Sequence, residues 1–318
     1  MRFPVTDHCD GERFFNVHDR TDHSFADVLR WLRSRERTPW PDAVVDPPHP
    51  PPTAADRETL AVTFIGHSTF LIQVGGMRFL TDPIYAQRAS PFSFVGPKRA
   101  RPPGQPLETL PKVDVTLVSH NHYDHLDPVA LREVAARWSS RAVTGLGNAA
   151  LLDRIGLKDT VELDWWGSVE IGGARITYVP AQHFSARTPF DRNRTLWGGF
   201  VIEAGGRTVL FAADSGYCPH FAEIAQRFPR IDLALLPIGA YEPRWFMGVV
   251  HMNPEDAVKA HRDLGAHRSV GMHFGTFALT DEGIDAPVTA LRRARAAAGL
   301  DEGDFTTLEF GETKVFPA

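Results

Sequence analysis

The sequence predicts an α/β (α+β) protein in which two mixed β-sheets, flanked by helices, form the layers of a single core. Apolar strand segments alternate with helical segments over about 250 residues, beginning at Leu60. A strand, a Gly-Gly pair and a second strand follow one another at 69–83, 169–180 and 200–214, which is typical of β-hairpins. The first and third copies end in Asp82 and Asp214, and this similarity hints at two related halves.

The sequence pattern changes near residue 58, from an irregular, proline-rich segment to alternating strands and helices. Residues 1–58 are expected to form an N-terminal extension, with a short amphipathic helix around 24–33 and a proline run at 47–52 that acts as a stiff connector. Residues 59–318 are expected to form one domain. It begins with three strands, and Gly75-Gly76 forms the turn between the second and third.

Further elements follow in alternation. We expect a strand at 113–119, helices at 128–137 and 148–155, and a strand at 231–238. The next helix is well marked, because Asn253 is a good N-cap, Pro254 suits the first turn and Gly265 ends the helical pattern. The last segment, 306–316, is expected to be a terminal hairpin.

Composition excludes several classes of protein. Forty-three per cent apolar and 23% charged residues are ordinary globular values, which exclude wholesale disorder. The net charge of −5 argues against nucleic acid as a partner. No apolar run is long enough to span a membrane, and the start lacks the apolar region of a signal peptide. With only Cys9 and Cys218, we expect a cytoplasmic protein, at most peripheral to a membrane.

Histidine is the unusual residue of this chain, with 14 copies. Directly after the strand that ends at Ser119 come four side chains able to bind metal: His120, His122, Asp124 and His125. Side chains alternate along an extended strand, so His120 and His122 point the same way and can hold one metal together. The turn into the following helix brings Asp124 and His125 toward a second position.

Three more candidate ligands, His183, Asp214 and His273, each follow an apolar strand. Because ligands bind at the carboxyl ends of strands in α/β sheets, these side chains are expected to converge. Imidazole and carboxylate suit zinc, so we predict two Zn²⁺ ions per chain, although ligand type leaves manganese and iron open. His67, in a Gly-His-Ser turn, and His251 are candidates for the rim of the site.

The motif HNHYDH, followed downstream by single His, Asp and His ligands, resembles the metallo-β-lactamase-fold hydrolases. The segments PAQHF, TLWGGFVIE, DSGYCPHF, PIGAYEPRWFM and MHFGTFAL narrow the resemblance to N-acylphosphatidylethanolamine-hydrolysing phospholipases D and their bacterial relatives, over about 28–279. This resemblance implies an αββα sandwich with a dinuclear metal site in residues 59–318. Phe184 and Ser215 stand where the mammalian enzymes have Trp and Thr.

The resemblance also implies roles for single residues. It assigns His120, His122 and His183 to the first zinc, Asp124, His125 and His273 to the second, and Asp214 to both. Asp82 is expected to support the motif loop from behind the ligands. Catalytic roles fall to Asp124, which orients or deprotonates the nucleophile, and to His251, for which capping of the next helix is an equal alternative. The expected substrate-binding residues are Tyr217, Trp245, Phe246 and Met247.

Together these features predict a zinc-dependent phosphodiesterase of phospholipase D type. A hydroxide shared by the two metals would attack a lipid phosphodiester such as N-acylphosphatidylethanolamine. Phe92 and Phe94, beside the cationic Lys98, Arg99 and Arg101, suit contact with an anionic lipid surface. The resemblance further suggests a homodimer.

Two alternatives stay open. A lactonase, or a hydrolase of small cyclic phosphodiesters, would use the same metal pair, because the hydroxide attacks carbonyl carbon as readily as phosphorus. A metal-stabilised binding protein without turnover is a third hypothesis, which the ligand set disfavours because structural zinc sites are usually closed and rich in cysteine.

Overall fold

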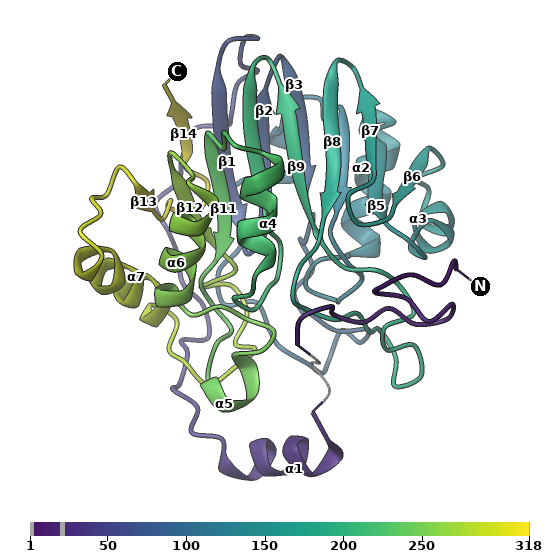
Figure 1. The fold of residues 1–318 in the computed structure, drawn as a ribbon. Helices are drawn as coiled ribbons and strands as arrows, with labels where there is room; N and C mark the ends of the chain where they lie inside the picture. Colours follow the sequence, from purple (N-terminus) through teal and green to yellow (C-terminus); the bar gives the residue numbers. More distant parts are fainter. Residues whose placement is uncertain (1–2, 20–22, 318) are drawn as a thin grey trace.

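Two mixed β-sheets pack face to face in the computed structural model, which describes residues 3–19 and 23–317, and helices cover the outer faces of both sheets (Figure 1). The first sheet contains seven strands in the order β14 (Thr313–Phe316), β1 (Leu60–Gly66), β2 (Thr69–Val74), β3 (Met77–Thr81), β4 (Val115–Val118), β5 (Arg141–Gly145) and β6 (Thr160–Leu163). The second sheet contains seven in the order β13 (Phe305–Thr306), β12 (Ser269–Met272), β11 (Leu233–Pro237), β10 (Arg207–Phe211), β9 (Gly199–Ala204), β8 (Ala174–Val179) and β7 (Ser168–Ile171).

The two sheets repeat one topology. In the first, β14, β1, β2 and β3 pair antiparallel and β3 to β6 pair parallel. In the second, β7 to β10 pair antiparallel and β10 to β13 pair parallel. The turns Gly75-Gly76 and Gly205-Gly206 abut, since a Cβ on Gly75 would lie 2.8 Å from the Cβ of Ala204. The topology therefore matches the two halves suggested by the repeated Gly-Gly pattern.

The helices are α1 (Phe25–Ser34), α2 (Pro128–Trp138), α3 (Ala149–Ile155), α4 (His220–Arg227), α5 (Arg244–Met247), α6 (Pro254–Leu264) and α7 (Ala286–Ala297), with a 3₁₀ turn, η1 (Leu107–Thr109). Side chains cap the first turns of α1, α2 and α6. Ser24 forms a capping box with Asp27, and Asn253 accepts from the backbone N–H of Asp256. Gly265 ends α6 at φ 57°, a conformation that glycine adopts without strain.

Aromatic side chains from both sheets fill the space between the layers. Phe64 and Phe70 come from the first sheet and Phe200 and Phe211 from the second, and all four are fully buried. Burial of each such side chain contributes about 1.5–3 kcal/mol to folding. One shared core therefore holds the two sheets together, as the sequence predicts.

The expected terminal hairpin is wrong. β13 pairs with β12 in the second sheet, whereas β14 pairs with β1 in the first. Between them the chain crosses from one sheet to the other at Phe310, whose ring packs 4.8 Å from that of Phe64 and 6.1 Å from that of Phe274. Burial of Phe310 between the layers separates the two strands, which local pairing would keep together.

The expected basic cluster at 98–101 is also wrong. Arg99 is buried, donates to the carbonyls of Ile84 and Ala86, and lies over a phenylalanine ring. Arg101 pairs with Asp46 and Asp285. Because these guanidinium groups are used inside the fold, neither is left to attract an anionic surface.

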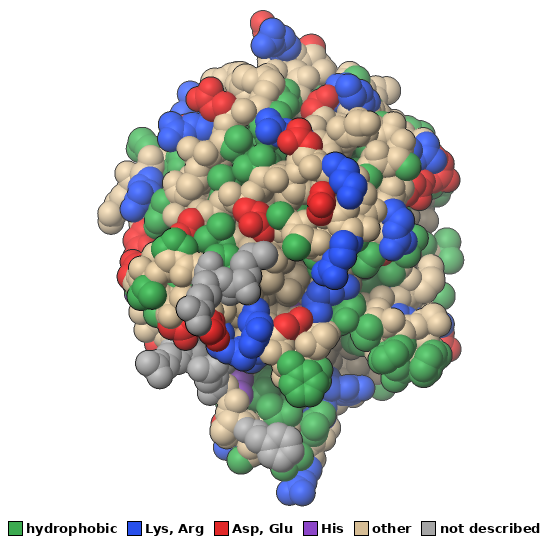
Figure 2. Space-filling view, turned by 90° about the vertical axis from the view of Figure 1, so that its right-hand side faces the viewer, with side chains coloured by type: hydrophobic (Ala, Val, Ile, Leu, Met, Phe, Trp, Pro, Cys, Tyr) green, Lys and Arg blue, Asp and Glu red, His purple; other side chains and the backbone are tan. Residues whose placement is uncertain are grey.

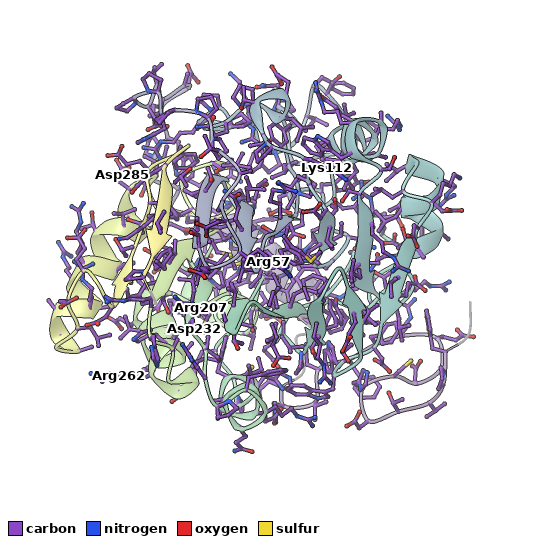
Figure 3. The ribbon with its side chains drawn as sticks, turned by 90° about the horizontal axis from the view of Figure 1, so that it is seen from above. Arg57, Lys112, Arg207, Asp232, Arg262 and Asp285 are labelled. Carbon is purple, nitrogen blue, oxygen red and sulfur yellow. The ribbon has the colours of Figure 1, made fainter. Side chains whose placement is uncertain are left out.

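At the edge of the sandwich that carries the Gly-Gly turns, polar side chains contact one another and stabilise the fold. Arg207 and Asp232 lie side by side there, with 3.4 Å between Nη1 and Oδ1 (Figure 3). Asp232 also accepts from the backbone N–H of Thr208. In the part of the chain that the structure describes, no helix is long and apolar enough to cross a bilayer.

His8 attaches the N-terminal segment, residues 3–19, to the connection between β6 and β7, which contains Asp164 and Trp165. Its ring nitrogens lie 2.6 Å from an oxygen of Asp7 and 2.8 Å from an oxygen of Asp164, and the ring stacks on Trp165 at 4.5 Å. Burial lowers the pKa of His8, but the hydrogen bonds and charges of Asp164 and Asp7 outweigh burial and raise it overall.

The raised pKa of His8 predicts a pH-dependent contribution to stability. The His8 interactions are strongest below the unfolded pKa, about 6.5, and weaken as the pH rises through the higher folded value. We expect His8→Gln to lower the urea midpoint more at pH 6 than at pH 9. An equal loss at both pH values, or a larger loss at pH 9, would contradict this assignment.

Candidate metal centre

The predicted ligands converge at one edge of the sandwich, opposite the Gly-Gly turns and at the lower side of the molecule in Figure 1. Each follows a strand that ends at this edge. His120 and its motif follow β4, His183 follows β8, Asp214 follows β10 and His273 follows β12. Strands of both sheets therefore contribute. In the second sheet, β10 and β12 both pair parallel with β11, and β8 runs in the same direction as β10 because each pairs antiparallel with β9, so their carboxyl ends lie at one edge.

A first group consists of three imidazoles. His120 Nε2 lies 2.9 Å from His122 Nδ1, and His183 Nε2 lies 3.2 Å from the same atom. Burial, with the neighbouring histidines, holds the pKa of His120 and His183 well below its usual range, and burial lowers the pKa of His122 to about 4. The three rings are therefore neutral at pH 7, as metal ligands must be.

A second group gathers around Asp124. Its Oδ2 lies 3.6 Å from His125 Nε2 and 3.5 Å from His273 Nε2. Burial raises the pKa of Asp124, but the charge of His125 and hydrogen bonds from His273 and His67 dominate and hold it well below the usual range. The carboxylate is thus ionised and available as a ligand.

Asp214 lies between the two groups. Its Oδ2 is 3.1 Å from the Nε2 atoms of both His125 and His273, and 3.8 Å from His183 Nε2. The second oxygen, Oδ1, is buried and has no hydrogen-bond partner within the described chain. A buried carboxylate oxygen without a partner is costly unless a cation coordinates it.

This donor set fits a pair of divalent cations. His120, His122 and His183 would hold one, Asp124, His125 and His273 the other, and Asp214 would contact both. Imidazole nitrogen and carboxylate oxygen are ligands used by zinc, and also by iron and manganese. The identity of the metal therefore stays a prediction.

Asp82 supports the motif loop in the way the sequence suggests. Its Oδ1 accepts the backbone N–H of Ser119 at 2.7 Å, and its Oδ2 lies 2.6 Å from Ser119 Oγ and 2.7 Å from His125 Nδ1. With a proton on Nδ1, His125 presents the lone pair of Nε2 to the site. Carboxylates in this position fix the tautomer and the orientation of a ligating histidine.

His67 contacts two members of the second group, Asp124 and His273, although the sequence indicates only a place at the rim of the site. It is fully buried, and its Nε2 lies 3.1 Å from Asp124 Oδ2. Its carbonyl accepts the backbone N–H of His273 at 2.8 Å. The Gly-His-Ser turn after an apolar strand is the signal that points to it.

Asn16 supports His183 in the first group. Its side-chain amide donates to the His183 carbonyl at 2.8 Å, and its Oδ1 accepts the His183 backbone N–H at 3.2 Å. The His183 ring is also fixed, since Nδ1 lies 3.0 Å from the carbonyl of Val250. Nothing in the local sequence marks Asn16, which lies more than 160 positions earlier in the chain.

Strained backbone positions gather around the centre. His67, Asp82, Ala213 and His273 have φ between 33° and 61°. A non-glycine residue in this region costs of order 1–3 kcal/mol, and such residues cluster at active sites. The packing of the two sheets holds these side chains where local preference alone would not.

The other predicted residues lie at different depths. His251 is buried, with its ring 5.1 Å from His183 and 5.3 Å from His273, and its Nδ1 has no partner in the described part of the molecule. Burial lowers its pKa to about 4. Tyr217, in contrast, turns its hydroxyl to Asp263 on α6, so the structure does not bring it into the ligand cluster. The capping alternative for His251 is not realised, because Asn253 caps α6.

The aromatic run on α5 faces α1. Phe246 stacks on His23 at 4.1 Å and on Trp31 at 4.8 Å, and Arg30 lies over the ring of Trp245. Met247 contributes its carbonyl, which accepts the backbone N–H of His251 at 2.9 Å. The run therefore borders the centre through His251, and its role in substrate binding stays a prediction.

Comparison with known proteins agrees with this geometry. The family model described as "Beta-lactamase superfamily domain" matches residues 77–274. The chain belongs to the metallo-β-lactamase superfamily. The expected αββα sandwich and the recognition of the family are thereby confirmed.

Several proteins similar to this chain are hydrolases. The chain is 39% identical to the N-acyl-phosphatidylethanolamine-hydrolyzing phospholipase D 1 of Caenorhabditis elegans, over 80% of this chain and 75% of the relative. It is 33% identical to a metal-dependent hydrolase of Anaeromyxobacter, over 71% of this chain and 78% of the relative. The solved structure of Igni18, a metallo hydrolase from Ignicoccus hospitalis, aligns with a TM-score of 0.61 at 24% identity, over 82% and 99% of the two chains. The protein is a metal-dependent hydrolase.

Asp82→Asn tests how the superfamily centre is supported. The amide can still accept from Ser119 N–H, but its NH₂ group then faces His125 Nδ1, which must surrender its proton to Nε2 and so lose the ligating lone pair there. We expect the metal affinity to fall about 10- to 100-fold, as measured by competition with a chromophoric chelator.

Asp232→Asn is the matched control, because it removes a buried carboxylate at the opposite edge. It should lower stability and leave the metal affinity unchanged. Equal metal affinity in Asp82→Asn and the native protein would contradict the role given to Asp82.

Proposed function

We propose that this protein is a dinuclear zinc phosphodiesterase of phospholipase D type, which cleaves N-acylphosphatidylethanolamine or a similar lipid phosphodiester. The observation that carries the proposal is 39% identity, over 80% of the chain, to a phospholipase D that hydrolyses N-acylphosphatidylethanolamine. The convergence of seven imidazole and carboxylate side chains supports it. Water would add to phosphorus, and the bond to the N-acylethanolamine oxygen would break.

The metals and the protein would divide the chemistry. Two divalent cations at these ligands would supply Lewis-acid chemistry, lowering the pKa of water and neutralising the charge of the phosphate. Asp124 would orient the attacking water and accept its proton at one carboxylate oxygen. His67 Nε2 contacts the other oxygen, Oδ2. His251 is neutral and has an unpaired Nδ1, so it suits hydrogen bonding to the phosphate or to the leaving oxygen.

An exposed apolar loop supports a lipid substrate. Phe92 and Phe94 are 54% and 78% exposed, and the neighbouring Val95 is half exposed. Single exposed apolar side chains are common, but three within four residues indicate an interaction surface. Lys98 is exposed at the end of this loop and would suit an anionic headgroup.

A cavity of about 470 Å³ lies between this loop and the chain around Tyr123 of the motif. Phe92 lines one side, and Tyr123 and Leu126, from the motif and its continuation, line another. The volume lies in the range of small-molecule sites, and the lining is largely apolar, as an acyl chain requires. On the face drawn in Figure 2, hydrophobic side chains gather in patches in the lower half beside lysine and arginine.

A vesicle assay tests the lipid assignment. Zinc-loaded protein should release phosphatidic acid from N-acylphosphatidylethanolamine vesicles, and Asp124→Asn should abolish the release. Hydrolysis of bis(p-nitrophenyl) phosphate without any phosphatidic acid would overturn the lipid substrate and leave a small-molecule phosphodiesterase.

The same assay separates surface binding from chemistry. Replacing both Phe92 and Phe94 by Ser should raise the apparent KM on vesicles and leave hydrolysis of bis(p-nitrophenyl) phosphate unchanged. Val45→Ser, at an exposed apolar site in the proline-rich segment, is the matched control and should alter neither.

A further inference from the structure

A second cluster of metal-binding side chains lies outside the dinuclear centre. Glu223 on α4 holds one histidine at each carboxylate oxygen: His18 Nε2 is 3.0 Å from Oε1, and His220 Nδ1 is 2.9 Å from Oε2. The rings of the two histidines are 4.6 Å apart, and one ligand atom from each of the three residues falls within 4.8 Å of the others. These separations are close to those of atoms that share one ion.

The chemistry of this cluster is that of a zinc site. Two imidazoles and one carboxylate form a known zinc ligand set, in which water completes the coordination. The side chains of His18 and Glu223 are 27% and 37% exposed, so an ion can enter and keep a water ligand. Burial raises the pKa of Glu223, but its two histidine partners outweigh burial and lower it, which leaves an anionic ligand at neutral pH.

Two of the three ligands are rigidly placed. His220 and Glu223 are three positions apart on one helix and share a face. Only 3% of the surface of His220 is exposed, and its ring packs edge-on against Trp165 at 5.6 Å. Its Nε2 has no partner among the described residues, so Nδ1 makes its one polar contact, on the side of Glu223. Preorganised ligands of this kind favour metal binding.

The third ligand belongs to the segment that supports the catalytic centre. His18 follows Asn16 by two residues, and Asn16 holds both backbone groups of His183. Between the two clusters the chain is anchored again, since the Gln182 side chain donates to the carbonyl of Asp19 at 2.8 Å. An ion bound by His18 would therefore fasten the segment that positions a ligand of the first metal.

We propose that His18, His220 and Glu223 bind a third divalent metal, zinc by its donor set, which clamps residues 14–19 onto α4 and steadies His183. The site differs in role from the dinuclear centre, because it holds two segments of the chain together and is not placed to meet the substrate. Zinc at this site would strengthen the attachment of the N-terminal segment beyond the contacts that His8 and Asn16 make.

The experiment measures two quantities in the native protein and in variants: the zinc content and the hydrogen exchange of backbone amides. Native protein, equilibrated with buffered free zinc and freed of unbound metal, should carry one zinc per chain more than His18→Gln or Glu223→Gln by mass spectrometry of the metal. In the native protein, hydrogen exchange of residues 3–19 should slow when zinc fills the third site. In both variants, the zinc concentration that fills the third site of the native protein should not slow this exchange. Neither readout requires turnover.

His49→Gln is the matched control. His49 Nε2 lies 3.0 Å from Glu309 Oε2, the same type of contact, but this pair is not part of any metal-competent group among the described residues. It should retain the full zinc content. Equal zinc content in the native protein and in both His18→Gln and Glu223→Gln would overturn the proposal, and so would exchange of residues 3–19 that does not respond to zinc.

Discussion

The rest of this structure depends on one buried carboxylate, that of Asp214, at the junction of the two sheets. Asp214 has one oxygen against the second histidine group and the other without a partner, in a place that water reaches poorly. An anion in such a place is stable only beside positive charge. In the chain without metal, His125 and His273 supply that charge, because, despite their burial, the charge of Asp214 raises the pKa of both rings. Divalent cations bound at the same ligands would take the place of these protons.

The two repeated halves explain how such a site is assembled. Each half brings an antiparallel hairpin into a parallel set of strands, and an aspartate follows the last hairpin strand, Asp82 after β3 and Asp214 after β10. The two aspartates have diverged in role. Asp214 faces both ligand groups, whereas Asp82 lies behind His125 and fixes its tautomer. Packing of the halves then places strained residues at the shared edge, and a common core of 54 buried side chains among the described residues makes this strain tolerable.

Much of this could be predicted from the sequence, because it depends on local pattern. Strand periodicity, paired glycines and the spacing of the HNHYDH motif concern neighbouring residues, and the structure bears them out. The failures concern contacts between distant segments. The separation of β13 from β14 depends on Phe310 lying between the layers, and the inward orientation of Arg99 depends on carbonyls some 13 to 15 positions away. The contact of Asn16 with His183 spans more than 160 positions, and no local pattern reports it.

Anomalous X-ray diffraction from crystals of zinc-loaded protein, recorded on both sides of the zinc absorption edge, tests whether both sheets present their strand ends to a pair of metal ions. Among the seven ligands of the dinuclear centre, two peaks are expected about 3.5–4 Å apart. One should lie among His120, His122 and His183, the other among Asp124, His125 and His273, with Asp214 in contact with both. A single peak among these seven side chains, or none, would contradict a dinuclear centre.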